Sequence, residues 1–288
     1  MSIQWFPGHM TAAKKKIEEA LEINDLVIEI LDARIPGAST NPMIESIRNQ
    51  RQRPHLKVLN KADLADDKIT QEWISFYNQQ PKTLCIAISA KHASEVKKIL
   101  PACAKIAPHR GTAIKPLRML IMGVPNVGKS TIVNSLKNKK IAKTGNEPAI
   151  TKSLQRIELN NQMILTDSPG MMWPKIDNAL DGFLLAASHT IGINAYDEID
   201  TALVLYDILK MSYAELLIKK YKLALPLPND ESFLCAIAEY RGFKIKGGEL
   251  DIHKAAVTFL GDYRQGVLGK VSLESPASRQ QSNLKNKS

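Results

Sequence analysis

Short apolar runs alternate with longer helical patterns through the first half of the chain. Four mostly apolar runs occupy residues 25–31, 55–59, 83–88 and 118–123. Between them, apolar residues recur at helical spacing around 42–50, 66–79 and 92–105. This alternation is typical of parallel strands joined by right-handed helical crossovers. We therefore predict an α/β fold with a buried, mostly parallel sheet flanked by helices.

The same reading adds elements on both sides of these strands. An amphipathic helix is expected from about Thr11 to Leu21, and another from about Lys129 to Leu136. An irregular basic stretch follows at 137–153. Two close strands, 154–159 and 162–166, are joined by Asn160-Asn161, a pair that suits a tight hairpin.

From residue 174 onward, strand patterns fade and helical ones dominate. They cover residues 178–188, 199–210, 213–221, 232–241 and 253–265. We therefore expect the α/β domain over residues 1–175 and a smaller all-helical C-terminal domain over 176–273. The tail, 274–288, is rich in Ser, Gln, Asn and Lys, a composition that predicts disorder.

An excess of basic residues changes the expected partners. The chain has 39 Lys and Arg against 29 Asp and Glu, a net charge of +10. Such a charge favours polyanions, with nucleic acid first among them, although a generically basic surface is the alternative. Candidate contacts are Lys14–Lys16, then Lys137, Lys139, Lys140 and Lys143, and in the C-terminal part Lys219, Lys220, Lys222, Arg241, Lys244 and Lys246. Three nearby aromatic residues, Tyr221, Tyr240 and Phe243, either stack on bases or belong to a helical core.

Cysteine spacing and the chain's first residues bear on the compartment. Cys85, Cys103 and Cys235 are far apart and lie in apolar runs, so they predict neither disulfides nor paired metal ligands. Residues 1–10 lack the pattern of a secretion or transit signal, and no uncharged apolar run is long enough to span a membrane. We expect a cytoplasmic protein that does not use a membrane and is a monomer in solution.

One contiguous motif predicts a phosphate site. Residues 123–130, GVPNVGKS, fit G-x-x-x-x-G-K-[ST] in full, and they lie between a predicted strand and a predicted helix. Backbone amides and the helix N-terminus can hold phosphates there, Lys129 can reach the outer phosphates, and Ser130 can ligate magnesium. The nucleotide-binding residues expected from this segment are Asn126, Val127, Gly128, Lys129, Ser130 and Thr131.

Two further segments complete the expected phosphate and metal site. Asp167-Ser-Pro-Gly170 follows a predicted strand, so Asp167 can hold the water shell of magnesium and the Gly170 amide can meet a terminal phosphate. Thr151 lies between the two, in the irregular stretch, where a switch threonine would close on magnesium. The alternative for Thr151 is a helix cap or a solvated loop residue.

A base-reading motif precedes all of these. Asn60, Lys61 and Asp63 follow a predicted strand, and the Asp63 carboxylate can accept from the ring N–H and the exocyclic amine of guanine. Adenine offers no such pair of donors, so the motif predicts selection of guanine. Ser89, Ala90 and Lys91 follow the next strand and can offer backbone amides to the guanine oxygen.

The order of these motifs is unusual for a guanine-nucleotide site, because the base-reading motif comes first. All of them follow strands of the predicted sheet, and in an open α/β sheet ligands bind outside the carboxyl ends of the strands. They can therefore converge whatever their order along the chain. Sequence order can be rotated when the ancestral termini lie close together.

Taken in order, NKAD, SAK, GVPNVGKS, Thr151 and DSPG resemble the circularly permuted GTPases that assist ribosome assembly. The runs 4–10, 32–42, 242–256 and 260–274 are similar to the YlqF family of ribosome biogenesis GTPases. The resemblance spans about residues 3–274. It implies a P-loop GTPase that binds GTP and GDP with magnesium, hydrolyses GTP, and binds the large (50S) ribosomal subunit and its rRNA late in maturation.

Two departures from the family pattern concern the switch segment. Pro148-Ala149-Ile150-Thr151 lacks the glycine that usually follows the proline, which reduces the backbone freedom of this loop. Ser168 stands where threonine is commoner. We still assign the switch role to Thr151.

The catalytic step is the least determined part. Met171 occupies the place of the usual water-orienting glutamine, so slow intrinsic turnover, stimulated by the ribosomal subunit, is expected. His9 is the candidate to orient water, with helix capping or packing as the alternative. Asn126 can lend its amide oxygen to potassium, or it is a turn residue only. Two other functions stay open: a GTP-dependent binding module that hydrolyses GTP only as a reset step, and a metabolic enzyme.

Overall fold

The computed structural model describes residues 18–43, 45, 46, 52–137, 154–170, 176 and 178–285. Within them, six strands form one sheet in the order β3-β2-β1-β4-β6-β5. All neighbouring strands are parallel except β5 and β6. The strands are β1 (Leu26–Asp32), β2 (His55–Asn60), β3 (Thr83–Ala87), β4 (Leu117–Gly123), β5 (Gln155–Asn160) and β6 (Met163–Asp167). Both the predicted parallel sheet and the predicted hairpin are confirmed.

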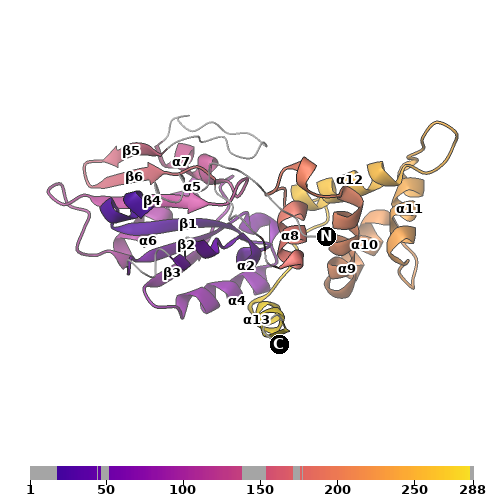
Figure 1. The fold of residues 1–288 in the computed structure, drawn as a ribbon, viewed down its shortest axis with the longest axis horizontal. Coiled ribbons are helices and arrows are strands. Elements are labelled where there is room, and N and C mark those ends of the chain that lie inside the picture. Colours follow the sequence, from indigo (N-terminus) through magenta and orange to yellow (C-terminus); the bar gives the residue numbers. More distant parts are fainter. Residues whose placement is uncertain are drawn as a thin grey trace.

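Helices cover both faces of the sheet (Figure 1). On one face, α6 (Ile99–Ile106) and α7 (Lys129–Lys137) pack on alternate residues of β1, such as Ile28 and Ile30. On the other, Trp73 and Tyr77 of α4 (Asp67–Asn78) pack against Leu31, Leu59 and Cys85. Every residue of β1 and β2 is buried, as expected for strands covered on both sides.

The remaining helical predictions for the first half are mostly confirmed. The pattern at 92–105 forms two helices, α5 (Ala93–Val96) and α6, instead of one. Residues 18–23 are helical, while 11–17 of the same predicted helix lie outside the described residues. A short helix, α2 (Pro36–Ser39), and a 3-10 turn, η1 (Ala62–Leu64), follow β1 and β2.

Five helices of the second half pack into a bundle beside the sheet (Figure 1). They are α8 (Ala179–Ala187), α9 (Glu198–Ser212), α10 (Ala214–Tyr221), α11 (Asp230–Arg241) and α12 (Ile252–Gln265), with a 3-10 turn, η2 (Ile193–Ala195), before α9. Aromatic rings fill the bundle: Tyr206 stacks on Phe233 with centroids 3.8 Å apart, and Phe233 meets Phe259 edge-on at 4.9 Å. The described part of the predicted helical region is therefore helical.

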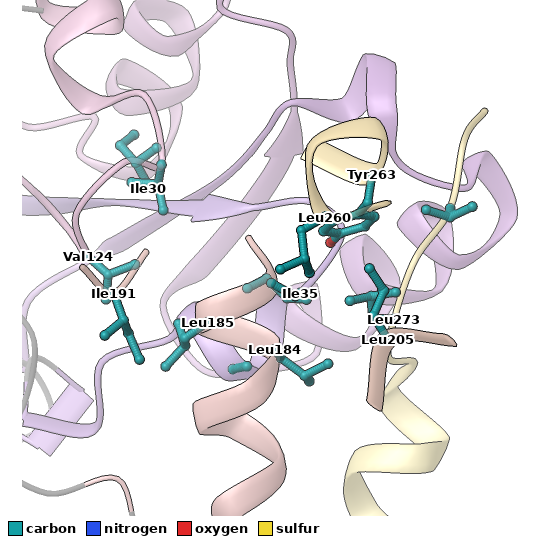
Figure 2. Close-up of a cluster of buried hydrophobic side chains, with 14 of the residues drawn as sticks. Ile30, Ile35, Val124, Leu184, Leu185, Ile191, Leu205, Leu260, Tyr263 and Leu273 are labelled. Atoms are coloured by element: carbon teal, nitrogen blue, oxygen red, sulfur yellow. The ribbon is translucent and has the colours of Figure 1, made fainter. Parts of the chain in front are cut away.

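The bundle and the sheet share one buried core. Figure 2 shows Val124 from the sheet side beside Ile191, and Ile35 beside Leu260, and all four belong to one buried cluster with Ile30 and Leu185. Arg264 of α12 also donates to the main-chain oxygens of Ala186 and Ala187, at 2.9 and 2.8 Å, and so caps the C-terminal end of α8. The division into domains at residue 175 stays a prediction.

The predicted disorder of the tail is wrong for residues 276–285, which form α13 (Pro276–Lys285). Ser275 and Ser278 cap its start reciprocally, with bonds of 2.9 and 3.2 Å, and Pro276 is the first helical residue. Arg279 then makes two bonds to the Asp181 carboxylate and one, at 3.3 Å, to Glu274. Caps and ion pairs thus order a helix whose composition is polar.

Candidate nucleotide site

The predicted site residues gather at one edge of the sheet because they end parallel strands. Asn60 is the last residue of β2, Gly123 of β4 and Asp167 of β6, while Ser89 follows β3 by two residues. These four strands run in the same direction, so their carboxyl ends share one edge. The expected convergence of the motifs is confirmed for the described residues.

Asn60 joins three of the motifs directly. Its Nδ2 donates to the main-chain oxygen of Val127 at 2.7 Å, and its Oδ1 accepts from the Ala90 amide at 2.9 Å. The side chain is 2% exposed. One buried amide therefore fixes the phosphate loop, residues 123–130, against both the guanine loop, residues 60–64, and the segment 89–91.

Glycines in the phosphate loop are required by close approach. A Cβ at Gly128 would lie 2.3 Å from Asn60 Nδ2, and the residue has a φ of +93°. A Cβ at Gly123 would lie 2.7 Å from the main-chain oxygen of Ile30. The glycines of the motif thus allow the loop to pack directly on the neighbouring strands, beside their role toward phosphates.

Lys129 and Asp167 form a buried ion pair across the phosphate loop. Lys129 Nζ lies 2.6 Å from Asp167 Oδ1, with the two side chains 6% and 0% exposed. Asp167 Oδ2 is buried and has no hydrogen-bond partner among the described residues. Because a buried carboxylate oxygen requires a donor or a cation, this atom fits the expected role of Asp167 in holding hydrated magnesium.

Other members of the predicted phosphate and metal site lie near this pair. Ser130 and Thr131 follow Lys129 in the first turn of α7 and are half-buried and exposed, respectively. Gly170 lies against the phosphate loop, where a Cβ would meet Pro125 at 3.2 Å. Within the described residues, no three His, Cys, Asp or Glu side chains cluster as a metal site.

The guanine loop has a special backbone and a charged surround. Lys61 is left-handed, with φ +63°, and its Nζ lies 2.8 Å from Asp32 Oδ2. Asp63 Oδ2 lies 2.7 Å from Lys91 Nζ. Burial raises the pKa of Asp63, but the hydrogen bond and charge of Lys91 outweigh it and hold that pKa below its usual value.

The segment 89–91 differs in one respect from the expectation. The Ser89 amide donates to Glu95 Oε2 at 2.7 Å, and the Ala90 amide donates to Asn60. Both amides thus have protein partners, and an oxygen of guanine would have to share or replace them. Contact of these amides with the base stays a prediction.

Asn126 is left-handed, with φ +59°, and its Nδ2 donates to the main-chain oxygen of His189 at 2.7 Å. This bond orients the amide and links the phosphate loop to the turn after α8. It is compatible with the predicted turn role and with a potassium ligand alike.

Three contacts of the site were not predicted from the sequence: the Asp32–Lys61 pair, the Glu95–Ser89 bond and the His189–Asn126 bond. Each joins a residue of a nucleotide motif to a residue outside the motifs, so the motif patterns do not mark them. Two buried charges in a strand and the turn after it, Asp32 and Arg34, were the available signal.

Several predicted residues lie outside the described residues, namely His9, Thr151, Met171 and the lysines at 14–16, 139, 140 and 143. Tyr221 is 1% exposed and contacts Phe233 and Phe259, so it belongs to the helical core and is not a base-stacking residue. Tyr240 is 49% exposed. In the described residues, no helix combines the length and apolar character that a membrane crossing requires.

Comparisons with known proteins agree with this geometry. A family model described as 50S ribosome-binding GTPase matches residues 118–226, which contain the phosphate loop and Asp167 but not the guanine loop. Ribosome biogenesis GTPase A of Bacillus cereus is 38% identical over 96% of this chain and 95% of its own length. The protein of the same name from Priestia megaterium is 36% identical over 98% and 99%.

Among solved structures, a GDP-bound YlqF is 27% identical, with a TM-score of 0.69 over 91% of this chain and 99% of its own. The two relatives match this chain along nearly the whole length of both partners. The chain therefore belongs to the ribosome biogenesis GTPase A (YlqF) family of GTP hydrolases.

Proposed function

We propose that the chain is a cytoplasmic, monomeric assembly factor that binds and hydrolyses GTP while it binds the 50S ribosomal subunit and its rRNA. The observation that supports this best is the pair of Asn60 hydrogen bonds, to Val127 and Ala90. They join the motif for guanine to the motif for phosphates in one site, although the order of the motifs is permuted. The names of its relatives support the ribosomal part.

In the proposed site, Asp63 reads guanine. Its partner Lys91 is 66% exposed, so it can leave for solvent when the two donors of the base arrive. A purine without those donors would leave a charged carboxylate without compensation. Asn60 and Lys61 fix the loop around the base, and residues 89–91 border it.

Phosphates lie in the loop 123–130. Lys129, now paired with Asp167, contributes a positive charge, and the amides of residues 126–131 and Gly170 contribute donors. Ser130, Asp167 and Thr151 would hold magnesium, which would neutralise charge on the phosphates. His9 orients the attacking water, and Asn126 contributes an oxygen to potassium.

Contact with rRNA is assigned to the basic end of the helical region. Lys219, Lys222, Arg241, Lys244 and Lys246 are all exposed. Such residues bind phosphates without reading sequence and position a protein on folded RNA. Arg241 ends α11, and Lys244 and Lys246 follow within five residues, so these three cations are close along the chain.

One assay tests the core of this function. Purified protein is given GTP or ATP at matched concentrations, with and without 50S subunits. We expect hydrolysis of GTP only, slow for the protein alone and at least tenfold faster with subunits. Equal use of ATP would refute the guanine site. GTP-dependent subunit binding without stimulated hydrolysis would instead favour a binding module that uses hydrolysis as a reset.

Two further measurements concern the roles proposed for His9 and Asn126. His9→Ala should leave GDP affinity unchanged and abolish stimulation by 50S subunits, and unchanged stimulation would remove His9 from the mechanism. Turnover should be faster in potassium than in sodium at equal ionic strength. Asn126→Ala should abolish this difference, and equal rates in the wild-type protein would remove the potassium site.

A further inference from the structure

A buried cluster of one carboxylate and two cations lies beneath the guanine loop. Asp32 is 0% exposed, and its carboxylate accepts from Arg34 Nε at 2.9 Å, Arg34 Nη2 at 2.8 Å and Lys61 Nζ at 2.8 Å. The two cations keep the pKa of Asp32 below its usual range although burial raises it. A carboxylate buried this deeply is stable only while its partners stay in place.

Arg34 is held in place independently of Lys61. Its Nη1 donates to the main-chain oxygen of Tyr263 at 3.2 Å, and its guanidinium lies 4.5 Å from the centre of the Tyr263 ring. Its own main-chain oxygen accepts from the Leu273 amide at 2.9 Å. Contacts from α12 and the segment after it therefore fix Arg34, and Arg34 in turn fixes the Asp32 carboxylate.

The charges of two carboxylates act on Lys61. It bonds to Asp32, and the negative charge of Asp63, two residues later in the same loop, also acts on it. Its side chain is 24% exposed, so the ammonium depends mainly on protein partners and not on water. If Asp32 lost its charge, Asp63 would be the carboxylate left for Lys61 to pair with. Unlike Lys91, which is 66% exposed and can move to solvent, Lys61 is only 24% exposed, so its ammonium on Asp63 would compete with guanine for the same oxygens.

We propose, on the basis of the guanine site proposed above, that Asp32 is a positioning residue for base selection. It holds Lys61 away from Asp63, so that, once the exposed Lys91 has moved to solvent, both oxygens of Asp63 are open to the ring N–H and the exocyclic amine of guanine. Asp32 acts through Lys61 and does not touch the base. Arg34 and Tyr263 supply the rigid support.

The test compares GDP with IDP, which lacks only the exocyclic amine. Because that amine adds a hydrogen bond to a charged group, the wild-type protein should bind GDP at least about tenfold more tightly than IDP. In Asp32→Asn, the preference should fall below about threefold. The ratio is internal to each variant, so a change in the folded fraction alone does not alter it.

A double-mutant cycle separates positioning from a general structural role. If Asp32 acts through Lys61, Asp32→Asn should change the GDP:IDP ratio only while Lys61 is present. The ratio in Lys61→Met and in the Asp32→Asn, Lys61→Met double variant should then be equal. Asp67→Asn is the matched control, because Asp67 is 78% exposed and its partner among the described residues is Lys270 at the surface; its ratio should equal that of the wild type.

Asp63→Asn distinguishes the proposed guanine site from the role of Asp32. Asp63→Asn should abolish the preference for GDP and gain binding of XDP, whose altered base matches an amide. If Asp63→Asn keeps the wild-type preference, the proposed guanine site is wrong. If Asp63→Asn loses it but Asp32→Asn keeps it, or if the double variant still differs from Lys61→Met, only the role of Asp32 is overturned.

A crystal structure of the wild-type protein with GDP provides a measurement that needs no variant. Lys61 Nζ within hydrogen-bond distance of Asp32, with the base on both oxygens of Asp63, supports the inference. Lys61 on Asp63 overturns it, even if Asp32→Asn does not fold.

Discussion

Asn60 Nδ2 donates to the main-chain oxygen of Val127 at 2.7 Å across 67 residues of sequence. The same side chain accepts from the Ala90 amide. The two bonds make a single buried amide the point at which three separate motifs meet. Its removal should affect fold stability and nucleotide binding together.

Asn60→Ala tests this directly. Loss of the side chain leaves the buried Val127 oxygen and the part-buried Ala90 amide without this partner, which should cost about 2–4 kcal/mol of unfolding free energy. GDP affinity should fall at least tenfold because the phosphate loop loses its tie. Asn229→Ala is the control: Asn229 is exposed and makes no capping bond, so we expect a change below about 0.5 kcal/mol. Equal effects of the two substitutions would contradict the assignment.

A pair of glycines should respond to alanine in opposite directions. At Gly128, φ is +93° and a Cβ would lie 2.3 Å from Asn60 Nδ2, so Gly128→Ala should destabilise the protein by at least about 2 kcal/mol and weaken GDP binding. Gly261 lies inside α12, and a Cβ there meets nothing within 4 Å. Gly261→Ala should therefore stabilise by about 0.5–1 kcal/mol. Urea unfolding and GDP titration measure both.

Glu274 predicts a pH dependence of stability. Burial raises its pKa from 4.5 to about 7, against the opposing charge of Arg279. The folded protein thus binds this proton more tightly than the unfolded chain, so the stabilisation is complete below pH 4.5 and is lost as pH rises through 7. Glu274→Gln removes this dependence.

Relative to the wild type, the Glu274→Gln variant should gain about 3 kcal/mol in unfolding free energy between pH 5 and pH 8. Gln can still accept from the Ala38 amide, a bond that measures 2.8 Å to Glu274 Oε1. Denaturant unfolding of both proteins at several pH values gives the difference. A difference independent of pH would show that Glu274 does not titrate in this range.

Arg279 should anchor α13. Its guanidinium pairs with Asp181 and Glu274, whose side chains are 11% and 5% exposed, so Arg279→Met should leave two nearly buried carboxylates and cost about 1–3 kcal/mol. Arg156→Met is the matched control, since Arg156 and Glu158 are 66% and 72% exposed and should contribute less than about 0.5 kcal/mol. Thermal unfolding compares them, and increased hydrogen exchange in 276–285 should accompany the loss.

The strands and the phosphate loop could be predicted because their signals are local. Strands buried on both faces appear in the sequence as continuous apolar runs, as β1 and β2 do. The phosphate loop needs its glycines and lysine in one contiguous turn, so its chemistry is visible as a motif. The convergence of the motifs followed from strand direction alone.

Contacts between distant segments could not be predicted in the same way. Arg34 meets Tyr263, 229 residues away, and nothing near either residue marks the pair. The disorder prediction for the tail is wrong for a related reason: its composition has few apolar residues, whereas its helix depends on the partners of Arg279 in α8 and at residue 274. Asp32 was visible only as part of a family run, without a role.

The segment after α12 binds the main chain of the guanine loop and of the residues after β1. The Val271 amide donates to the Leu64 oxygen at 3.0 Å, and the Leu273 amide donates to the Arg34 oxygen at 2.9 Å. During synthesis, the half of the pocket that reads the base leaves the ribosome well before the half that holds the phosphates. Residues 271–273, which bind that first half, are synthesised after both halves. A nascent chain stopped before residue 271 would thus have every nucleotide motif and still lack the two main-chain bonds that hold the guanine loop and the segment of Arg34.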